Sequence, residues 1–312
     1  MLSSKARMMR LLLKNRHLLK GKLHPETVDK NTSIEKLRAD TEEGAKRLAK
    51  PAKGICYVIE EGAPMYAEWV RPDGCDESLA VLYFHGGGFV MGSALSHRNI
   101  VSGFAKRLNV QALTFDYRLA PEHPAPAAAE DGATMYRYLL KNGFKPEHIA
   151  FAGDSAGGGV ALSTLLKLKD EGVPLPAACA LFSPCTDMTL SGASHKTRIE
   201  SDPCTPRGSS ETFLAYYVGQ GDAKHPYASP LFGELDGLPP TIIQVGDLET
   251  LLDDSVRLAE RLKEAGVETH IRVWDGLFHC FPLLAPMFPE ATEALEEVCA
   301  FLRQKLQNNG SV

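Results

Sequence analysis

The strongest constraint on the fold is a regular alternation of short apolar runs and longer helix-like segments along most of the chain. Several runs, such as 80–84 and 241–245, are almost entirely apolar. Such runs are typical of strands buried on both faces, as in a parallel sheet covered by helices. We expect eight strands, at 54–60, 64–71, 79–84, 111–117, 149–152, 178–183, 241–245 and 270–274. Helical patterns lie between them, at 95–108, 127–141, 156–170, 251–265 and 290–307. The alternation predicts an α/β fold, a three-layer sandwich around a mostly parallel eight-stranded sheet. The tight connection at 61–64 predicts an antiparallel hairpin at one edge of it.

Two segments depart from this alternation. Residues 1–50 are charged and helical in pattern, and Thr32 or Ser33 is the expected N-cap of the second helix. Residues 190–225 are polar, rich in Pro and Gly, and contain one short aromatic helix pattern. We interpret them as an insertion above the sheet that shares a lid with the N-terminal helices. The chain is thus divided into helical cap residues 1–50 and a main domain at 51–312 that carries the insertion.

Composition and charge limit the classes of partner. The net charge of −5 does not suggest nucleic acid, and no apolar run approaches the roughly 18 residues of a membrane span. The seven cysteines are scattered, odd in number and without metal-type spacing. This pattern favours free thiols in a reducing compartment. We therefore expect a cytoplasmic protein without a metal site.

The N-terminal segment has an unusual charge. Residues 1–22 contain seven Lys or Arg and no acidic residue. A signal peptide is not expected, because the longest apolar stretch is 11–13 and no small-residue cleavage site follows. We favour a basic helix that packs on its own protein, with a membrane-surface helix as the alternative.

A candidate nucleophile lies at one strand–helix junction. The sequence reads Gly-Asp-Ser-Ala-Gly at 153–157, after a predicted strand and before an Ala-rich helix. In this context the motif predicts a nucleophile elbow, in which Ser155 stands exposed at the carboxyl edge of the sheet and at a helix N-terminus. A plain β-turn-α connection is the structural alternative. A phosphate-binding loop is disfavoured, because the Gly-Lys-Ser/Thr ending is missing.

A second glycine-rich turn follows the strand at 79–84. Residues 85–88 read His-Gly-Gly-Gly, and three consecutive glycines are costly in conformational entropy. They make sense where backbone N–H groups must approach a reacting oxygen, as in an oxyanion hole completed by the N–H of Ala156. We interpret His85 as a structural residue of the loop rather than a base.

The base and the acid should follow the serine in that order. His279 lies in a short loop after the last strand, whereas His270 begins that strand and would lie at the opposite sheet edge. Four carboxylates compete for the role of acid, namely Asp247, Glu249, Asp253 and Asp254. The last two are expected in the following helix. Position alone favours Glu249 without settling the choice.

Taken together, these motifs resemble the hormone-sensitive-lipase-like branch of the α/β-hydrolases, the bacterial family IV esterases. The similarity covers about residues 55–305 and rests on His-Gly-Gly-Gly-Phe at 85–89, Asp-Tyr-Arg-Leu-Ala-Pro-Glu-His-Pro at 116–124, and Gly-Asp-Ser-Ala-Gly-Gly at 153–158. Tyr-Ala-Ser-Pro-Leu at 227–231 and Leu-Pro-Pro at 238–240 also fit. The resemblance implies an α/β-hydrolase fold with a helical cap.

The resemblance also assigns site residues. It implies a catalytic triad of Ser155, Glu249 and His279. It places the oxyanion hole at the N–H groups of Gly86, Gly87, Gly88 and Ala156. The family usually has Asp-Pro-Leu where this chain has Glu-Thr-Leu at 249–251, so the triad departs from the common Ser-Asp-His. The 116–124 segment is expected to brace the elbow.

These features predict two-step hydrolysis of esters with short to medium acyl chains, without a metal or organic cofactor. The expected pocket is lined by Phe89, Phe213, Tyr217, Phe278 and Leu283. One alternative is an amidase or peptidase, which would need an anchoring charge that no residue identifies. Another is a non-catalytic ligand receptor, which would typically lose a triad member. The last strand, if it is an open edge, could pair with a second copy as a homodimer.

Overall fold

The computed structural model describes residues 2–19, 21, 23, 26–48 and 53–308. Its α-helices are α1 (Ser4–Lys14), α2 (Arg16–Leu19), α3 (Ile34–Leu48), α4 (Arg98–Leu108), α5 (Ala127–Lys141), α6 (Ala156–Asp170), α7 (Ser194–Thr197), α8 (Ser209–Val218), α9 (Leu252–Glu264) and α10 (Pro289–Asn308). Its strands are β1 (Ile55–Ile59), β2 (Ala67–Pro72), β3 (Asp76–Phe84), β4 (Val110–Phe115), β5 (Ile149–Asp154), β6 (Ala178–Phe182), β7 (Thr241–Gly246) and β8 (Thr269–Trp274). Within these ranges, no helix is long and apolar enough to cross a lipid bilayer.

The eight strands form one sheet in the order β1-β2-β4-β3-β5-β6-β7-β8. Strand β2 is antiparallel to both of its neighbours, and every other neighbouring pair is parallel. The central register places Leu82 of β3 between Leu113 of β4 and Phe151 of β5. The predicted mostly parallel sheet and its antiparallel edge hairpin are thereby confirmed, and β8 forms the opposite edge.

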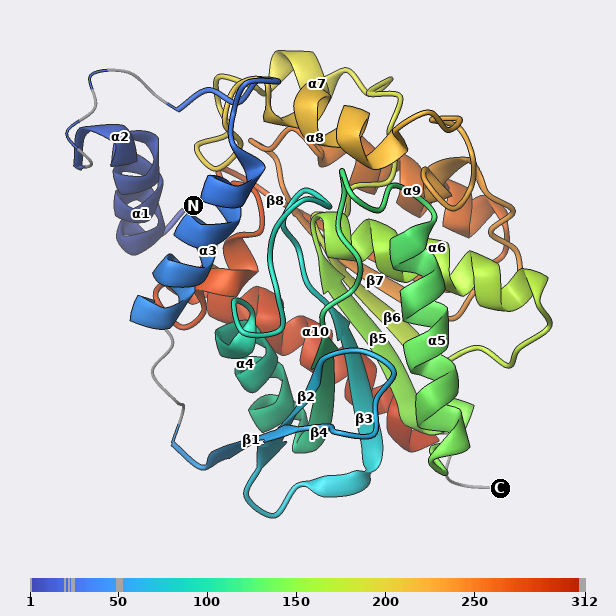
Figure 1. Cartoon of the computed structure of the whole chain (residues 1–312). Coiled ribbons are helices and arrows are strands. Elements are labelled where there is room, and N and C mark those ends of the chain that lie inside the picture. The colour runs from blue at the N-terminus through green and yellow to red at the C-terminus, as the bar shows by residue number, and fades with distance from the viewer. Residues whose placement is uncertain (1, 20, 22, 24–25, 49–52, 309–312) are drawn as a thin grey trace.

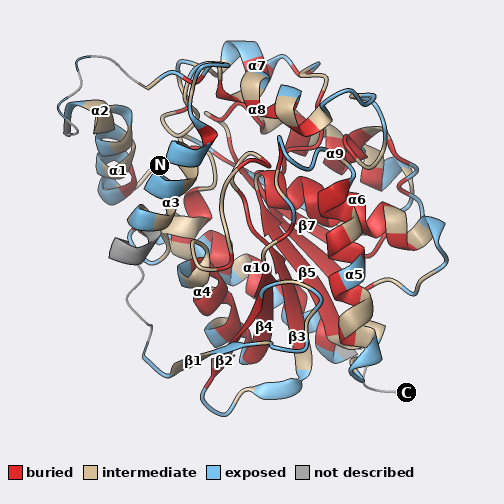
Figure 2. Cartoon of the chain, in the orientation of Figure 1, coloured by how far each residue is buried: buried red, intermediate tan, exposed pale blue. Residues whose placement is uncertain are grey.

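Helices cover both faces of this sheet (Figure 1). Helices α5, α6 and α9 contribute to one apolar core, and α4 and α10 contribute to the other. The central strands are buried along their length, while the outer surfaces of the helices are exposed (Figure 2). Burial on both faces explains why these strands are near-continuous apolar runs rather than alternating ones.

The parallel strands deliver polar side chains to a single edge of the sheet. Ser155 directly follows β5, Ser183 directly follows β6, and Glu249 follows β7 by three residues. His279 lies five residues after β8. Because the carboxyl ends of parallel strands meet at one edge, residues far apart in sequence gather there, as ligand sites of open α/β sheets generally do.

The N-terminal helices and the insertion lie in contact with each other. Ser33 caps α3, since its hydroxyl accepts the Lys36 N–H at 3.1 Å. Thr27 and Arg207 form a β-bridge, and the Val28 N–H donates to the Arg207 carbonyl at 2.9 Å. The insertion holds α8, the predicted aromatic helix, and the one-turn α7, which was not predicted. The expected domain boundary falls within residues 49–52, outside the described residues, so the division at residue 50 stays a prediction.

Candidate active site

Ser155 occupies the sharp turn between β5 and α6. Its backbone has φ 53° and ψ −123°, a region that residues other than glycine seldom adopt. Two hydrogen bonds hold this strained turn: the Ser155 N–H donates to the Phe182 carbonyl at 2.8 Å, and the Ser155 carbonyl accepts the Cys185 N–H at 2.9 Å. The predicted elbow is present, and it presents the hydroxyl at the start of α6.

The motif glycines are required because other backbone passes close to them. A Cβ on Gly157 would lie 2.1 Å from the Phe84 carbonyl oxygen, and a Cβ on Gly153 would lie 2.7 Å from the Gly157 oxygen. Strand β3 and the elbow can therefore approach this closely only without those side chains.

Three side chains form a continuous hydrogen-bonded line. Ser155 Oγ lies 2.9 Å from His279 Nε2, and His279 Nδ1 lies 2.9 Å from Glu249 Oε2. These are the distances over which a general base can take a hydroxyl proton and a carboxylate can orient an imidazole. The fold thus brings together the three residues that the sequence predicted as a triad.

Glu249 is fully buried, and both of its carboxylate oxygens have hydrogen-bond partners. Its second oxygen accepts the Ser183 hydroxyl at 2.8 Å and the Gly246 N–H at 2.5 Å. Burial raises the pKa of Glu249, although hydrogen bonding to His279 opposes that shift. Sequence reasoning missed Ser183, and the available signal was a polar residue directly at the carboxyl end of a central strand.

The three competing carboxylates have other partners. Asp247 accepts the Gly276 N–H at 2.7 Å, within the loop that leads to His279. Asp253 accepts the Ser194 N–H at 2.9 Å, and Asp254 accepts from Thr186 and lies 2.8 Å from His195 Nε2. Their carboxylates hold the surrounding loops together, and of the four only Glu249 contacts His279 within the described residues.

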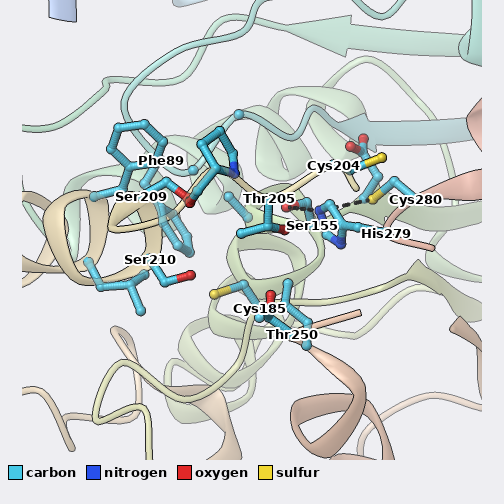
Figure 3. Close-up of a pocket in the computed structure, with 18 of the residues that line it drawn as sticks. Phe89, Ser155, Cys185, Cys204, Thr205, Ser209, Ser210, Thr250, His279 and Cys280 are labelled. Carbon is cyan, nitrogen blue, oxygen red and sulfur yellow. Dashed lines mark hydrogen bonds between the residues drawn. The ribbon is translucent and has the colours of Figure 1, made fainter. Parts of the chain in front are cut away.

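His279 sits between two groups that favour its charged form. Burial by itself lowers the pKa of His279, but Cys280 and Glu249 raise it by more, so the net pKa lies well above the usual histidine value. Cys280 Sγ lies 3.4 Å from His279 Nε2, on the same nitrogen that faces Ser155 (Figure 3). Burial raises the pKa of Cys280 to about 11, although the neighbouring His279 opposes that shift.

The glycine loop divides into two kinds of N–H group. The Gly86 N–H donates to Asp154 Oδ1 at 3.1 Å, and Gly86 is not among the described residues that line the cavity. By contrast, Gly87, Gly88 and Ala156 line the cavity, and no acceptor within the described residues takes their N–H groups. The assignment of Gly86 to the oxyanion hole is therefore wrong, because its one donor is already used to fasten the loop.

The segment at 116–124 braces this loop from behind. Tyr117 donates its hydroxyl to the His85 carbonyl at 2.6 Å, and the two rings stack with centroids 4.2 Å apart. The Ala120 N–H donates to the Phe89 carbonyl at 2.9 Å. Burial lowers the pKa of His85 to about 3, in keeping with a structural rather than a basic role. Segment 116–124, which was expected to brace the elbow, therefore makes these contacts with the glycine loop instead.

A cavity of about 270 Å³ opens over Ser155 (Figure 3). Phe89 and Phe213 line it as expected, together with Met91, Leu214 and Leu251. Among the described residues, Tyr217, Phe278 and Leu283 do not reach it, and these three pocket assignments are corrected. The Tyr217 ring stacks behind the Phe89 ring, with ring centroids 3.8 Å apart. Phe278 is buried in the core around Trp274, and Leu283 packs against the core under α10.

The cavity wall is mixed in chemistry. Its apolar part comes from the glycine loop, α8 and the start of α9, and its polar part includes Thr205, Ser209, Ser210 and Thr250. Within the described ranges, no three His, Cys, Asp or Glu side chains cluster as metal ligands would. The arrangement offers a nucleophile, a base with its carboxylate, and free N–H donors around one small space.

Comparison with known proteins extends this picture. The sequence profile of a family described by the alpha/beta hydrolase fold matches residues 81–283. An acetyl-hydrolase of Streptomyces hygroscopicus is 41% identical over 237 residues, which cover 76% of this chain and 79% of that protein.

Two solved structures cover nearly the whole chain. The protein EstE5, in a crystal soaked with p-nitrophenyl butyrate, superposes with a TM-score of 0.88 at 41% identity, covering 98% of this chain and 99% of that one. An esterase described as belonging to the bacterial hormone-sensitive lipase family superposes with a TM-score of 0.89 at 35% identity, with the same coverage of 98% and 99%.

Proposed function

This chain belongs to the α/β-hydrolase family, in its hormone-sensitive-lipase-like branch, and from that premise we propose that Ser155, His279 and Glu249 are the triad of its ester hydrolysis. The chain is an ester-hydrolysing enzyme, so the receptor alternative is set aside. The observation that carries the assignment is the unbroken line of 2.9 Å contacts from the Ser155 hydroxyl to the Glu249 carboxylate.

The proposed reaction has two acyl-transfer steps. His279 Nε2 takes the Ser155 proton as Oγ attacks the ester carbonyl, and the protonated imidazole then gives that proton to the departing alcohol. A water molecule, deprotonated by the same nitrogen, attacks the acyl-enzyme and releases the acid and free Ser155. Glu249 holds the Nδ1–H tautomer and stabilises the imidazolium in both steps.

The carbonyl oxygen becomes negative in each tetrahedral intermediate. The N–H groups of Gly87, Gly88 and Ala156 are the proposed donors to it, and one such donor is worth about 3–4 kcal/mol of transition-state stabilisation. The N-terminus of α6 adds a favourable field at the same place.

The cavity supports short to medium acyl groups as substrates. Its volume of about 270 Å³ is near the lower limit of small-molecule pockets, roughly 300–1,000 Å³. Two relatives support the same substrate class, since one is named an acetyl-hydrolase and the crystal of another was soaked with a butyrate ester.

The test is hydrolysis of p-nitrophenyl esters from acetate to palmitate, with p-nitroanilides of the same acids in parallel. We expect turnover to peak at short or medium chains and to fall at least about 10⁴-fold in Ser155→Ala. Faster turnover of the anilides than of the esters would favour the amidase alternative. Activity retained in Ser155→Ala would mean that another nucleophile acts.

Two further proposals concern the whole molecule's setting. All seven cysteines are unpaired, which supports a reducing, cytoplasmic location; fractionation of the producing cell would test it.

Strand β8 is an edge strand, which supports a homodimer through β8. Sedimentation velocity should detect a dimer that Val273→Lys dissociates, and a monomer at all concentrations would reject it.

A further inference from the structure

Helix α1 has one face that packs on the protein. Ala6 is fully buried, and Met9 and Leu13 pack against the aromatic cluster of Trp274, Phe278, Phe281 and Phe288. Ser3 caps the helix and donates to the Glu290 carboxylate at 2.8 Å. The helix is thus docked in a defined orientation, as the favoured interpretation of the sequence required.

The opposite face of α1 exposes large apolar side chains. Met8 is 57% exposed, Leu11 61% and Leu12 45%. Just beyond the helix, Leu18 is 56% exposed and Leu23 85%. These five are half of the ten large hydrophobic side chains that are exposed among the described residues, although they occupy a stretch of only sixteen positions. Scattered surface leucines need no explanation, but this concentration does.

Cations border the exposed apolar stripe. At about 100° per residue, Met8 and Leu11 lie at the centre of the outer face, Arg7 and Lys14 lie on one side, and Lys5 lies on the other. All three cations are exposed. An apolar stripe bordered by Lys and Arg is the arrangement of helices that lie in the interface of a lipid bilayer.

The charge of this segment differs from that of the remaining chain. Residues 1–25 hold seven Lys or Arg and no Asp or Glu. The whole chain has 34 basic and 39 acidic residues, so without these seven cations 27 basic residues remain against 39 acidic ones, a net charge of −12. A negatively charged surface would therefore attract the N-terminal segment and repel the body, which orients the molecule.

We propose that the outer face of α1, with Leu18 and Leu23, docks the enzyme on anionic lipid bilayers. Insertion of the apolar stripe and contact of Lys5, Arg7 and Lys14 with lipid phosphates would act together. A second copy of the chain is a poorer occupant, since a few side chains on an eleven-residue helix fall short of the roughly 800 Å² that each partner buries in a stable complex.

The position of α1 gives the docking a functional consequence. Arg10 donates to the Gly276 carbonyl at 3.3 Å, in the loop that carries His279. Arg16 donates to the Pro203 carbonyl at 3.0 Å, next to Cys204 in the cavity wall. In Figure 1, α1 and α2 lie at the left side of the molecule. Docking would hold two segments of the cavity wall close to the lipid surface.

The experiment is co-sedimentation of the full chain with vesicles. Wild type should bind vesicles of equal phosphatidylcholine and phosphatidylglycerol, should not bind pure phosphatidylcholine, and should be released by high salt. The variants Leu11→Ser/Leu12→Ser and Arg7→Glu/Lys14→Glu should each bind anionic vesicles at least about tenfold less tightly. For the second variant the reason is that each basic residue near an anionic surface raises the binding constant about fivefold. Both should hydrolyse a water-soluble p-nitrophenyl ester at the wild-type rate, which shows that they are folded.

Matched controls remove equal apolarity or charge elsewhere. Val58→Ser/Ile59→Ser alters exposed apolar side chains of β1, and Lys141→Glu/Lys263→Glu reverses two exposed cations of the body. Both controls should bind like wild type, and so should Ser155→Ala, which separates docking from the proposed catalysis. Three outcomes would each overturn the proposal. Wild type would bind neutral and anionic vesicles equally, or the control variants would lose as much binding as the α1 variants. In the third, the protein would bind no vesicles but would form a concentration-dependent dimer that is lost in Leu11→Ser/Leu12→Ser.

Discussion

At the scale of single residues, the carboxylate beside His279, the proposed base, is the least expected feature. A glutamate carries one methylene more than the usual aspartate, so its carboxylate needs additional support to meet His279. Here the Gly246 N–H and the Ser183 hydroxyl both bind one oxygen and leave the other, Oε2, directed at His279 Nδ1. The extra length is thereby taken up by fixed hydrogen bonds.

We expect Glu249→Gln to lower kcat about 10³–10⁴-fold, because an amide cannot stabilise the imidazolium or select its tautomer. Glu249→Asp should fall between wild type and Glu249→Gln, since the charge is kept but the contact with His279 is lengthened. Steady-state hydrolysis of p-nitrophenyl butyrate measures both. A kcat for Glu249→Gln within about tenfold of wild type would exclude Glu249 as the acid.

Ser183→Ala tests the support of that carboxylate. A hydrogen bond to a charged group is worth about 1.5–3 kcal/mol, so we expect kcat to fall about tenfold to hundredfold with little change in KM. Because Ser183 acts through Glu249, the acid limb of the pH profile should also move. Ser163→Ala is a matched control: Ser163 is equally buried, but its hydroxyl has no partner among the described residues, so its loss should leave kcat unchanged.

At the scale of elements, the strand–turn–helix unit of β5 and α6 depends on close approach of backbone. The elbow packs against the end of β3, where the carbonyl groups of Phe84 and His85 approach Gly157 in the first turn of α6. The glycine loop after β3 is fastened to the same unit, because Asp154 accepts both the Gly86 N–H and the Tyr83 hydroxyl. The proposed nucleophile and the proposed oxyanion donors are thus positioned by a single pair of neighbouring strands, β3 and β5.

Gly157→Ala should destabilise the fold by about 3 kcal/mol or more, because the new Cβ would meet the Phe84 and His85 carbonyl oxygens at 2.1 and 2.4 Å. Gly44→Ala is the opposite case, a helical glycine with no neighbouring atom within 4 Å, and should stabilise by up to about 1 kcal/mol. Urea unfolding measures both. Equal effects of the two substitutions would contradict the close approach at the elbow.

At the scale of the whole molecule, the site is assembled from the ends of five strands, β3, β5, β6, β7 and β8, and the titration of His279 reflects its burial, Cys280 and Glu249. The pKa of His279 lies well above the usual histidine value, because Cys280 and Glu249 outweigh burial. The base must be neutral to act, and a raised pKa keeps it protonated to higher pH. We therefore expect kcat/KM to fall on the acid side with a midpoint above about 6.5. A midpoint below that value in a pH–rate profile would show that burial dominates instead.

The sequence by itself predicted the strand–helix alternation, the turn at Ser155 and His279 as the proposed base, because each depends on neighbours along the chain: apolar periodicity, flanking glycines and position after the last strand. It also narrowed the acid to four carboxylates and favoured one. Only the tertiary structure decided which of the glycine N–H groups face the cavity, that Ser183 supports Glu249, and that Tyr217, Phe278 and Leu283 pack in cores instead of lining the pocket. The contacts Gly86–Asp154 and Ser183–Glu249 join residues more than sixty positions apart, and the packing of the other three side chains depends on the three-dimensional cores around them, so neither can be deduced from local sequence patterns.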